Sequence, residues 1–310
     1  MSVAFVFPGQ GSQSVGMMTA LADEAVVRDV FTEAGEALGQ DLWQIVQEGP
    51  EETLNSTEIT QPAMLAAGVA LWRLWQSRGG PVPAFMAGHS LGEYSALVAA
   101  GSLAFADAVK LVHRRGRFMQ EAVPAGSGAM AAILGLDDEA VADVCTAAAE
   151  GAVVEPVNFN APGQVVVAGE RAAVERATVL AKEQGAKRAL MLPVSVPSHC
   201  SLMKPAAEQL AGDLAAVGID APSVPVICNV DVTPVADAEA IRDALVRQLY
   251  RPVRWVEIIR YLAAQGVDQL VECGPGKVLT GLNKRIERAM TARAVFDPSS
   301  LEQALAELGA

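Results

Sequence analysis

The chain has 310 residues, of which 51% are hydrophobic and 19% charged, and its formal net charge at pH 7 is −13. A chain of this length can bury a large core, whereas its acidic balance argues against a nucleic acid partner, because phosphate binding needs a dominant basic face. The N-terminus lacks a basic region and no apolar stretch approaches about 18 residues, so we expect neither a secretion signal nor a membrane span.

The first predicted element is a buried strand at the N-terminus. Residues 3–7 form a continuous apolar run, which ends in the sequence Pro8-Gly9-Gln10-Gly11-Ser12-Gln13. A loop after an early strand is a common source of an oxyanion-hole donor in enzymes with a serine nucleophile, and Gln10, flanked by glycines, is the candidate. The loop fails as a dinucleotide fingerprint, because Ser14 stands where the third glycine is required.

A reactive serine is predicted after the next strand. The pentapeptide Gly88-His89-Ser90-Leu91-Gly92 lies between an apolar strand, residues 84–87, and a helix, residues 93–100. In this context G-x-S-x-G indicates a nucleophile elbow, a turn so sharp that only glycines fit beside the serine. The amide of Leu91 is then one oxyanion-hole donor, and the following helix aims its N-terminal amides at the developing negative charge.

The chain has three histidines, and one of them must act as the base for this serine. His89 adjoins Ser90 on an extended segment, where successive side chains point to opposite sides, so we expect it to support the elbow. His113 falls outside the apolar stripe of a helix predicted over residues 105–122, which places it on a solvated face. Elimination therefore leaves His199.

His199 follows a strand-like segment and a break at Pro197, just ahead of a helix predicted over residues 203–217. The positive end of a helix disfavours imidazolium, which keeps the ring neutral and able to accept a proton near pH 7. The alternative is that this histidine caps a loop for structural reasons.

The helix over residues 105–122 carries an arginine within its apolar stripe. Arg115 lies four residues before Met119 and four after Leu111. An unpaired buried guanidinium costs several kcal/mol, so its partner is either an internal carboxylate or the carboxylate of a ligand. Arg115 lies close to the elbow in the sequence, which favours a ligand's carboxylate as its partner. A planar guanidinium offers two parallel donors to a free carboxylate, so it would select an acyl group that ends in one.

The pattern between residues 125 and 195 predicts an inserted subdomain. The order strand, helix, strand, strand, helix, strand is that of a ferredoxin-like split βαβ unit. Its elements are predicted at residues 129–134, 138–150, 153–159, 164–169, 171–184 and 188–194. Alternating strands and helices on either side predict a parallel-sheet α/β core made of residues 1–124 and 198–310, with residues 125–197 inserted. We expect the active-site cleft between the two, with Ser90 on the core and His199 just past the insertion.

The C-terminal part holds one failed motif and one basic segment. Gly274-Pro275-Gly276-Lys277 is not a phosphate loop, because Val278 replaces the required serine or threonine. From Lys277 to Arg293 there are five basic residues and one acidic residue, a charge run that usually means a solvated helix face.

The four cysteines show no C-x-x-C pair and no metal-ligand spacing with histidine, so the sequence predicts no metal site. Free thiols are typical of a reducing cytosol, and we therefore predict a cytoplasmic protein.

Several of these segments together resemble the malonyl-coenzyme A:acyl carrier protein transacylase family of fatty acid synthesis, in its free-standing bacterial form. The segments are Phe7-Pro8-Gly9-Gln10-Gly11-Ser12-Gln13, Gly88-His89-Ser90-Leu91-Gly92-Glu93, Arg115-Gly116 with Phe118-Met119, Val196-Pro197-Ser198-His199 and Gln248-Leu249-Tyr250. The match spans nearly the whole chain.

The resemblance implies an α/β-hydrolase-like core with a ferredoxin-like insertion. It also implies an acylated serine, a histidine base, two oxyanion donors, an arginine that holds the malonyl carboxylate, and a main-chain carbonyl that orients the histidine. By position these are Ser90, His199, Gln10 with Leu91, Arg115, and Gln248. The basic segment becomes a predicted docking site for an acidic acyl carrier protein, with Lys284 and Arg285 as docking residues.

Three functions remain open. The first is a cofactor-free, ping-pong transfer of malonyl from malonyl-CoA to the pantetheine thiol of acyl carrier protein, through a malonyl-serine. The second is a serine hydrolase, in which water is the acceptor, and the third is an idle subunit that only binds the carrier. Arg115 and the basic segment favour transfer over hydrolysis, and the presence of both Ser90 and His199 argues against an idle subunit.

Overall fold

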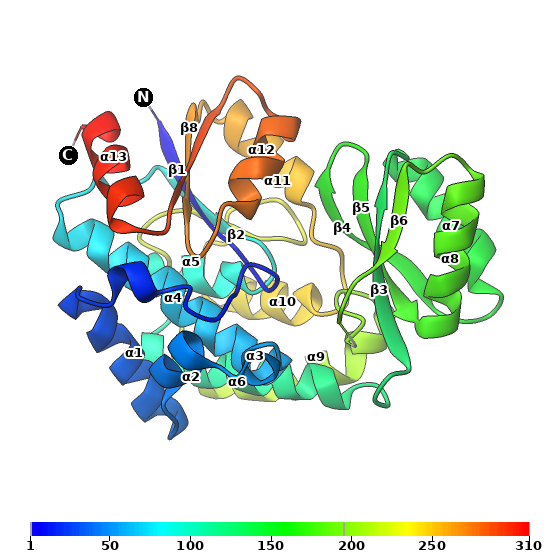
Figure 1. Cartoon of the computed structure of the whole chain (residues 1–310), viewed down its shortest axis with the longest axis horizontal. Coiled ribbons are helices and arrows are strands. Elements are labelled where there is room, and N and C mark those ends of the chain that lie inside the picture. Colours follow the sequence, from blue (N-terminus) through cyan, green and yellow to red (C-terminus); the bar gives the residue numbers. More distant parts are fainter. Residues whose placement is uncertain (1, 195, 310) are drawn as a thin grey trace.

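The computed structural model describes residues 2–194 and 196–309, and within them the chain forms two sheets (Figure 1). The larger sheet has five parallel strands in the order β7-β2-β1-β8-β9. These strands are β1 (Val3–Phe7), β2 (Phe85–Gly88), β7 (Val226–Ile227), β8 (Gln269–Cys273) and β9 (Thr291–Val295).

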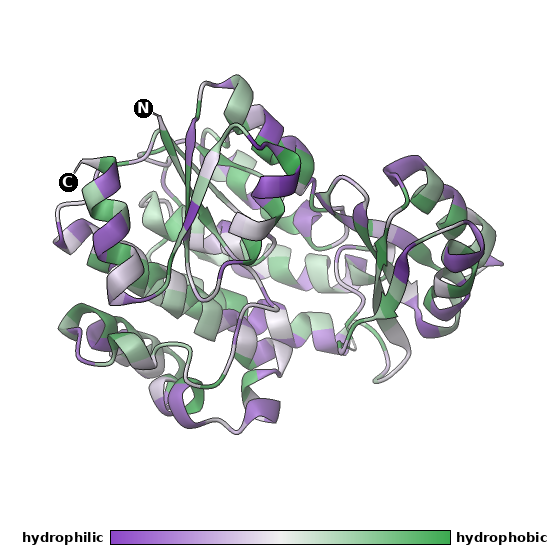
Figure 2. Ribbon diagram, turned by 45° about the horizontal axis from the view of Figure 1, so that its top comes forward, coloured by the Kyte–Doolittle hydropathy of each residue, from purple (hydrophilic) through white to green (hydrophobic). Residues whose placement is uncertain are grey.

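Helices cover both faces of this sheet. Phe5 and Phe7 of β1 pack against α4 (Thr57–Ser77) and α5 (Gly92–Ala99) on one face. Ala4 and Val6 pack against α11 (Trp255–Ala264) and α12 (Val278–Ile286) on the other. Burial on both faces explains why the first strand reads as an unbroken apolar run. Figure 2 shows hydrophobic residues along the central strands of the larger sheet.

Further helices pack on the side of the sheet that carries α4 and α5. Here α6 (Phe105–Glu121) packs between α4 and α9 (Lys204–Ala216), and α1 (Ala25–Leu38) packs on both α4 and α6. The other helices are α2 (Leu42–Glu48), α3 (Glu51–Leu54), α10 (Ala238–Gln248) and α13 (Pro298–Leu308). Among the described residues, no helix combines the length and the apolar character that a membrane crossing requires.

The smaller sheet is formed by the chain between α6 and α9. Its strands are antiparallel in the order β4-β5-β3-β6, with β3 (Gly128–Leu134), β4 (Val154–Ala161), β5 (Gln164–Glu170) and β6 (Arg188–Met191). The helices α7 (Asp138–Ala149) and α8 (Arg171–Glu183) cover the face that points away from the core (Figure 1). The predicted α/β core with a ferredoxin-like insertion is therefore confirmed.

The predicted elements of the insertion agree with the observed ones to within two residues, except at β6. That strand ends at Met191, three residues before the predicted end. The domain limits at residues 125 and 197 stay predictions, and Ser195, inside that span, lies outside the described residues.

Backbone hydrogen bonds attach the smaller sheet to the core. Phe159 in β4 donates its amide to the carbonyl of Val253 at 3.0 Å, and Val253 donates to the carbonyl of Val157 at 2.8 Å. Close to this junction, the ring of His89 at the end of β2 meets Asn160 Oδ1 through its Nε2, at 2.8 Å. The carboxyl end of β2, where the elbow was predicted, therefore lies where the two sheets meet.

Candidate active site

The turn after β2 has the geometry of a nucleophile elbow. Ser90 adopts a left-handed backbone conformation, with φ of 52°, directly before α5. A Cβ on Gly88 would lie 1.8 Å from the carbonyl carbon of Gly92, and one on Gly92 would lie 2.0 Å from the carbonyl oxygen of Phe7. The chain therefore approaches itself too closely for any side chain at either position, as the sequence predicted.

Ser90 and His199 are in direct contact. The Ser90 Oγ lies 2.7 Å from His199 Nε2, and His199 Nδ1 lies 2.7 Å from the carbonyl oxygen of Gln248. A carbonyl oxygen only accepts hydrogen bonds, so Nδ1 carries the ring proton and Nε2 is left to accept from the serine hydroxyl. The arrangement is that of a nucleophile, its base and the group that orients the base.

Burial keeps the His199 ring neutral. His199 is 3% exposed, and burial, followed by the positive charge of Arg115, lowers its pKa to about 3. The sequence predicted a neutral ring from the positive end of the following helix, whereas the causes in the structure are burial and the neighbouring guanidinium. The consequence is the same, because the ring is unprotonated near pH 7.

Arg115 is buried, as its position in the apolar stripe of α6 predicted, and it lies beside Ser90. Its side chain is 1% exposed. Its guanidinium donates to Gln61 Oε1 at 2.7 Å, to Gln248 Oε1 at 3.0 Å and to Ser90 Oγ at 3.3 Å. All three acceptors are neutral oxygens.

Arg115 has no carboxylate partner among the described residues, none of whose ion pairs includes it. Its Nε is buried without a hydrogen bond, and burial lowers the pKa of the guanidinium. The nearby acid, Glu93, instead accepts from Gln248 Nε2 at 2.8 Å and from the amide of Asn229 at 3.0 Å. Of the two partners that the sequence left open, the described part of the chain therefore does not supply the internal carboxylate.

Gln248, the last residue of α10, joins the serine, the histidine and the arginine. Its backbone carbonyl accepts from His199, its Oε1 accepts from Arg115, and its Nε2 donates to the carbonyl of Ser90 at 3.0 Å. The sequence analysis predicted only the first of these contacts. Burial raises the pKa of Glu93, the other acceptor for this amide, to about 7.

Of the two predicted oxyanion donors, Leu91 belongs to the elbow and Gln10 to a neighbouring loop. The loop that carries Gln10 packs on it: the amide of His89 donates to the carbonyl of Phe7 at 3.0 Å, and a Cβ on Gly9 would lie 2.5 Å from the His89 carbonyl. Gln10 itself is exposed, whereas Leu91 is buried, and the Leu91 amide donates to no described residue. The oxyanion role of both residues stays a prediction.

The other two histidines lie away from the serine hydroxyl. His89 packs its ring near Trp255 at 5.5 Å between centroids and contacts Asn160, which agrees with a supporting role. The prediction that His113 lies on a solvated face is wrong. The residue is half-buried, and its Nδ1 donates to the carbonyl of Glu58 at 2.9 Å, because the first turn of α4 packs closely over α6.

Lys284 and Arg285 lie on α12, and both are exposed. Neither side chain contacts the serine, the histidine or the buried arginine. Arg285 donates to the carbonyl of Pro162, in the turn between β4 and β5, at 3.1 Å, and to Oε1 of Gln164, the first residue of β5. It therefore helps to attach the inserted subdomain to the core, and a docking role stays a prediction for both residues.

Sequence reasoning missed three buried polar residues of this site. Gln61 and Glu93 lie within the helices α4 and α5, and Asn229 follows the two-residue strand β7. The available signal for Asn229 was its place after a parallel strand, since side chains at the carboxyl ends of such strands gather at one edge. Within the described residues, no cluster of three or more histidine, cysteine, aspartate or glutamate side chains could hold a metal ion.

Comparison with known proteins identifies the family. Residues 4–295 match the acyl transferase domain family. The chain is 62% identical over 305 residues to a malonyl CoA-acyl carrier protein transacylase of Salmonella typhimurium, an alignment that covers 98% of this chain and 99% of that protein. The chain belongs to this transacylase family. The resemblance stated from the sequence is thereby confirmed.

Solved structures of the transacylase family agree in fold. The crystal structure of an acyl carrier protein S-malonyltransferase from Vibrio cholerae is 62% identical, with a TM-score of 0.95, and the match covers 98% of this chain and 99% of that one. A malonyl-transacylase solved in complex with a type II PKS acyl-carrier protein is 58% identical, with a TM-score of 0.98, over 99% of this chain and 100% of that one.

The depressed pKa of His199 can be tested by nuclear magnetic resonance. Since the folded-state pKa lies well below the ordinary 6.5, the His199 ring should not titrate between pH 8 and about 5. Replacing Arg115 by Met removes one of the two main causes and should raise that pKa. The ring signal is assigned by its loss in His199→Gln, and a midpoint near 6.5 in the parent protein would contradict the neutral-base account.

Proposed function

We propose that this member of the transacylase family transfers a malonyl group from malonyl-CoA to the pantetheine thiol of acyl carrier protein, and so supplies malonyl groups for fatty acid synthesis. One observation carries the proposal. The Ser90 hydroxyl lies 2.7 Å from a neutral histidine nitrogen and 3.3 Å from a guanidinium that has no carboxylate partner among the described residues. In malonyl-Ser90, one methylene group separates the ester carbonyl from the free carboxylate. The carboxylate would therefore lie close to the Ser90 oxygen and beside Arg115.

In the first half-reaction His199 acts as a general base. Its Nε2 takes the proton of the Ser90 hydroxyl while Oγ attacks the thioester carbonyl carbon of malonyl-CoA. The carbonyl electrons move to oxygen, and the tetrahedral oxyanion then collapses and expels the coenzyme A thiolate. His199 returns its proton to that thiolate, which leaves malonyl-Ser90 and a neutral imidazole.

We assign the stabilisation of the oxyanion to the amide of Leu91 and to Gln10. Support comes from the Leu91 amide at the start of α5, which has no acceptor in the part of the chain that the structure describes, and from the close packing of the Gln10 loop against the elbow. The N-terminus of α5 adds a favourable dipole at the same place.

In the second half-reaction the carrier's thiol replaces coenzyme A. His199 takes the thiol proton, the sulfur attacks the malonyl ester carbon, and the leaving Ser90 oxygen recovers the proton from His199. Base, nucleophile and charge stabilisation all come from the protein, so the proposed reaction uses no cofactor. Because the four cysteines are buried free thiols, we place this chemistry in the cytoplasm.

Arg115 selects the acyl group in this proposal. A free acyl carboxylate can accept two parallel hydrogen bonds from a guanidinium, and in a buried site such a pair is both strong and directional. An acyl group without a carboxylate leaves the guanidinium with neutral acceptors only. Malonyl is therefore preferred over acetyl.

The serine assignment predicts the outcome of labelling. Malonyl-CoA should add one malonyl group to the parent protein, detected by intact-protein mass spectrometry, and acyl carrier protein should then remove it. Ser90→Ala should abolish the label, and His199→Ala should slow acylation by about 10²–10⁴-fold. Ser102→Ala, which removes another buried serine hydroxyl, is the control and should label normally. A label that survives Ser90→Ala would refute the assignment.

The docking assignment predicts an effect on the second step alone. Lys284→Glu should slow transfer to an acidic carrier protein by about three- to tenfold at low salt, because it reverses an exposed charge that faces the carrier. Added salt should shrink that difference, and acylation by malonyl-CoA should change little. Lys110→Glu, at an exposed lysine on α6, is the matched control. Equal transfer rates for the two variants would reduce the basic segment to a solvated helix face.

A further inference from the structure

Asn229 contacts the backbone of the elbow next to the nucleophile. The residue follows β7, and its side chain is fully buried. Its Oδ1 accepts from the amide of Ser90 at 2.7 Å, and its Nδ2 donates to the carbonyl of Gly88 at 2.7 Å. One side-chain amide therefore bridges the backbone on both sides of His89.

This bridge holds a conformation that serine rarely adopts. The φ of Ser90 is 52°, in the left-handed region that favours glycine. A residue stays there only when its surroundings fix it. The amide of Ser90 needs an acceptor in this turn, and Asn229 Oδ1 is the acceptor that it has.

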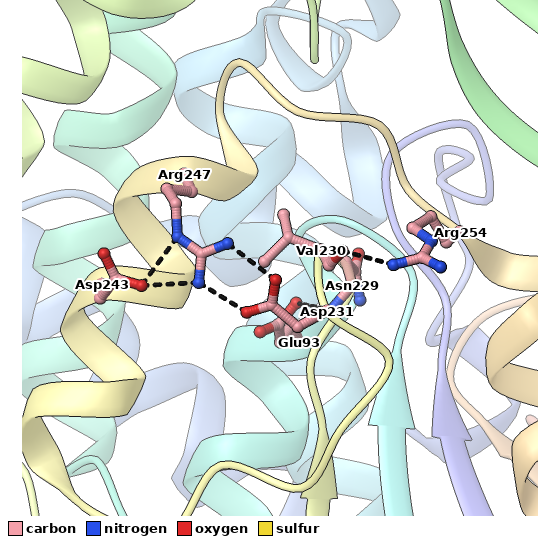
Figure 3. Close-up of polar contacts among 7 residues, drawn as sticks. All are labelled: Glu93, Asn229, Val230, Asp231, Asp243, Arg247 and Arg254. Carbon is pink, nitrogen blue, oxygen red and sulfur yellow. Dashed lines mark hydrogen bonds and ion pairs between the residues drawn. The ribbon is translucent and has the colours of Figure 1, made fainter.

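The loop that carries Asn229 is itself anchored from two sides (Figure 3). Arg247 on α10 donates to Asp231 through both terminal nitrogens, NH1 to Oδ1 at 2.9 Å and NH2 to Oδ2 at 2.6 Å. Arg254 donates to the carbonyl of Val230 at 3.1 Å. The same guanidinium of Arg247 also contacts Asp243, which lies on α10 and does not belong to the loop.

The anchor connects the elbow with the rest of the site. Arg247 is the neighbour of Gln248, whose carbonyl orients His199. The backbone amide of Asn229 donates to Glu93 Oε2, and this oxygen also accepts from Gln248 Nε2. The nucleophile and the group that orients its base are thus held to one another through the Asn229 loop.

We propose that Asn229 is a positioning residue for the acylation of Ser90, and that the Asp231–Arg247 ion pair holds Asn229 in place. This inference rests on the function proposed above. Asn229 contacts the backbone of the elbow and not the reacting oxygen, so it acts through the orientation of Ser90. Its removal should therefore slow the acylation step and leave the binding of malonyl-CoA nearly unchanged.

The first test compares two buried asparagines. Asn229→Ala should lower the single-turnover rate constant of acylation by about 10–100-fold, since a misplaced reacting group costs that much. The half-saturating concentration of malonyl-CoA should stay within about twofold. Asn283→Ala is the matched control. Asn283, on α12, is equally buried, and its side chain also donates to a backbone carbonyl, that of Met290. It should lower the melting temperature and keep the parent rate constant.

The second test does not disturb the core. The Asp231 and Asp243 side chains are 46% and 60% exposed, so both variants to Ala should fold. Asp231→Ala frees the loop and should slow acylation several-fold, whereas Asp243→Ala leaves the Asp231–Arg247 pair intact and should react at the parent rate.

The outcomes separate this inference from the proposed function. If the parent protein is not malonylated on Ser90, the proposed function fails. If the parent is malonylated and Asn229→Ala matches its rate constant, or if Asp231→Ala and Asp243→Ala react alike, the positioning role is refuted.

Discussion

The buried guanidinium of Arg115 is the constraint around which the site is organised. A positive charge removed from water needs hydrogen-bond acceptors, and here Gln61, Gln248 and Ser90 supply neutral oxygens. The charge is therefore solvated by dipoles and not neutralised by a carboxylate among the described residues. Together with burial, which is the larger cause, it lowers the pKa of the neighbouring His199. In the function proposed above, the same unneutralised charge selects an acyl group that brings its own carboxylate, so one guanidinium acts on both the acyl group and the base.

The backbone stores strain at the proposed nucleophile and its proposed base. Ser90 and His199 both have positive φ, a conformation that costs a non-glycine residue on the order of 1–3 kcal/mol. The surrounding hydrogen bonds offset this cost: the Ser90 amide has Asn229, and the His199 amide donates to the carbonyl of Leu249 at 3.0 Å. Because Leu249 adjoins Gln248, the C-terminal end of α10 fixes both the position of the histidine and the orientation of its ring.

Local sequence pattern predicted the elbow, the order of elements in the insertion and the burial of Arg115, since each depends on residues that are close in the chain. It predicted His199 only by elimination. The contact between Asn229 and Ser90 could not be predicted, because it spans 139 residues and depends on β7 pairing with β2. A strand as short as β7 has no measurable periodicity. The error at His113 also arose from a contact that is distant in the sequence, because its packing partner, Glu58, lies in another helix.

The most direct test of this account is the acyl selectivity of Arg115→Ala, measured as malonyl and acetyl transfer rates together with the melting temperature. The account predicts that malonyl transfer loses about 2–5 kcal/mol of charge pairing while acetyl transfer is spared or improved, so that the preference inverts. The melting temperature should fall moderately, because the variant loses a buried side chain and its hydrogen bonds to Gln61 and Gln248, so the ratio of the two transfer rates carries the test. Equal losses for both acyl groups would show that the arginine supports the structure of the site and does not select the acyl group, and would contradict the account.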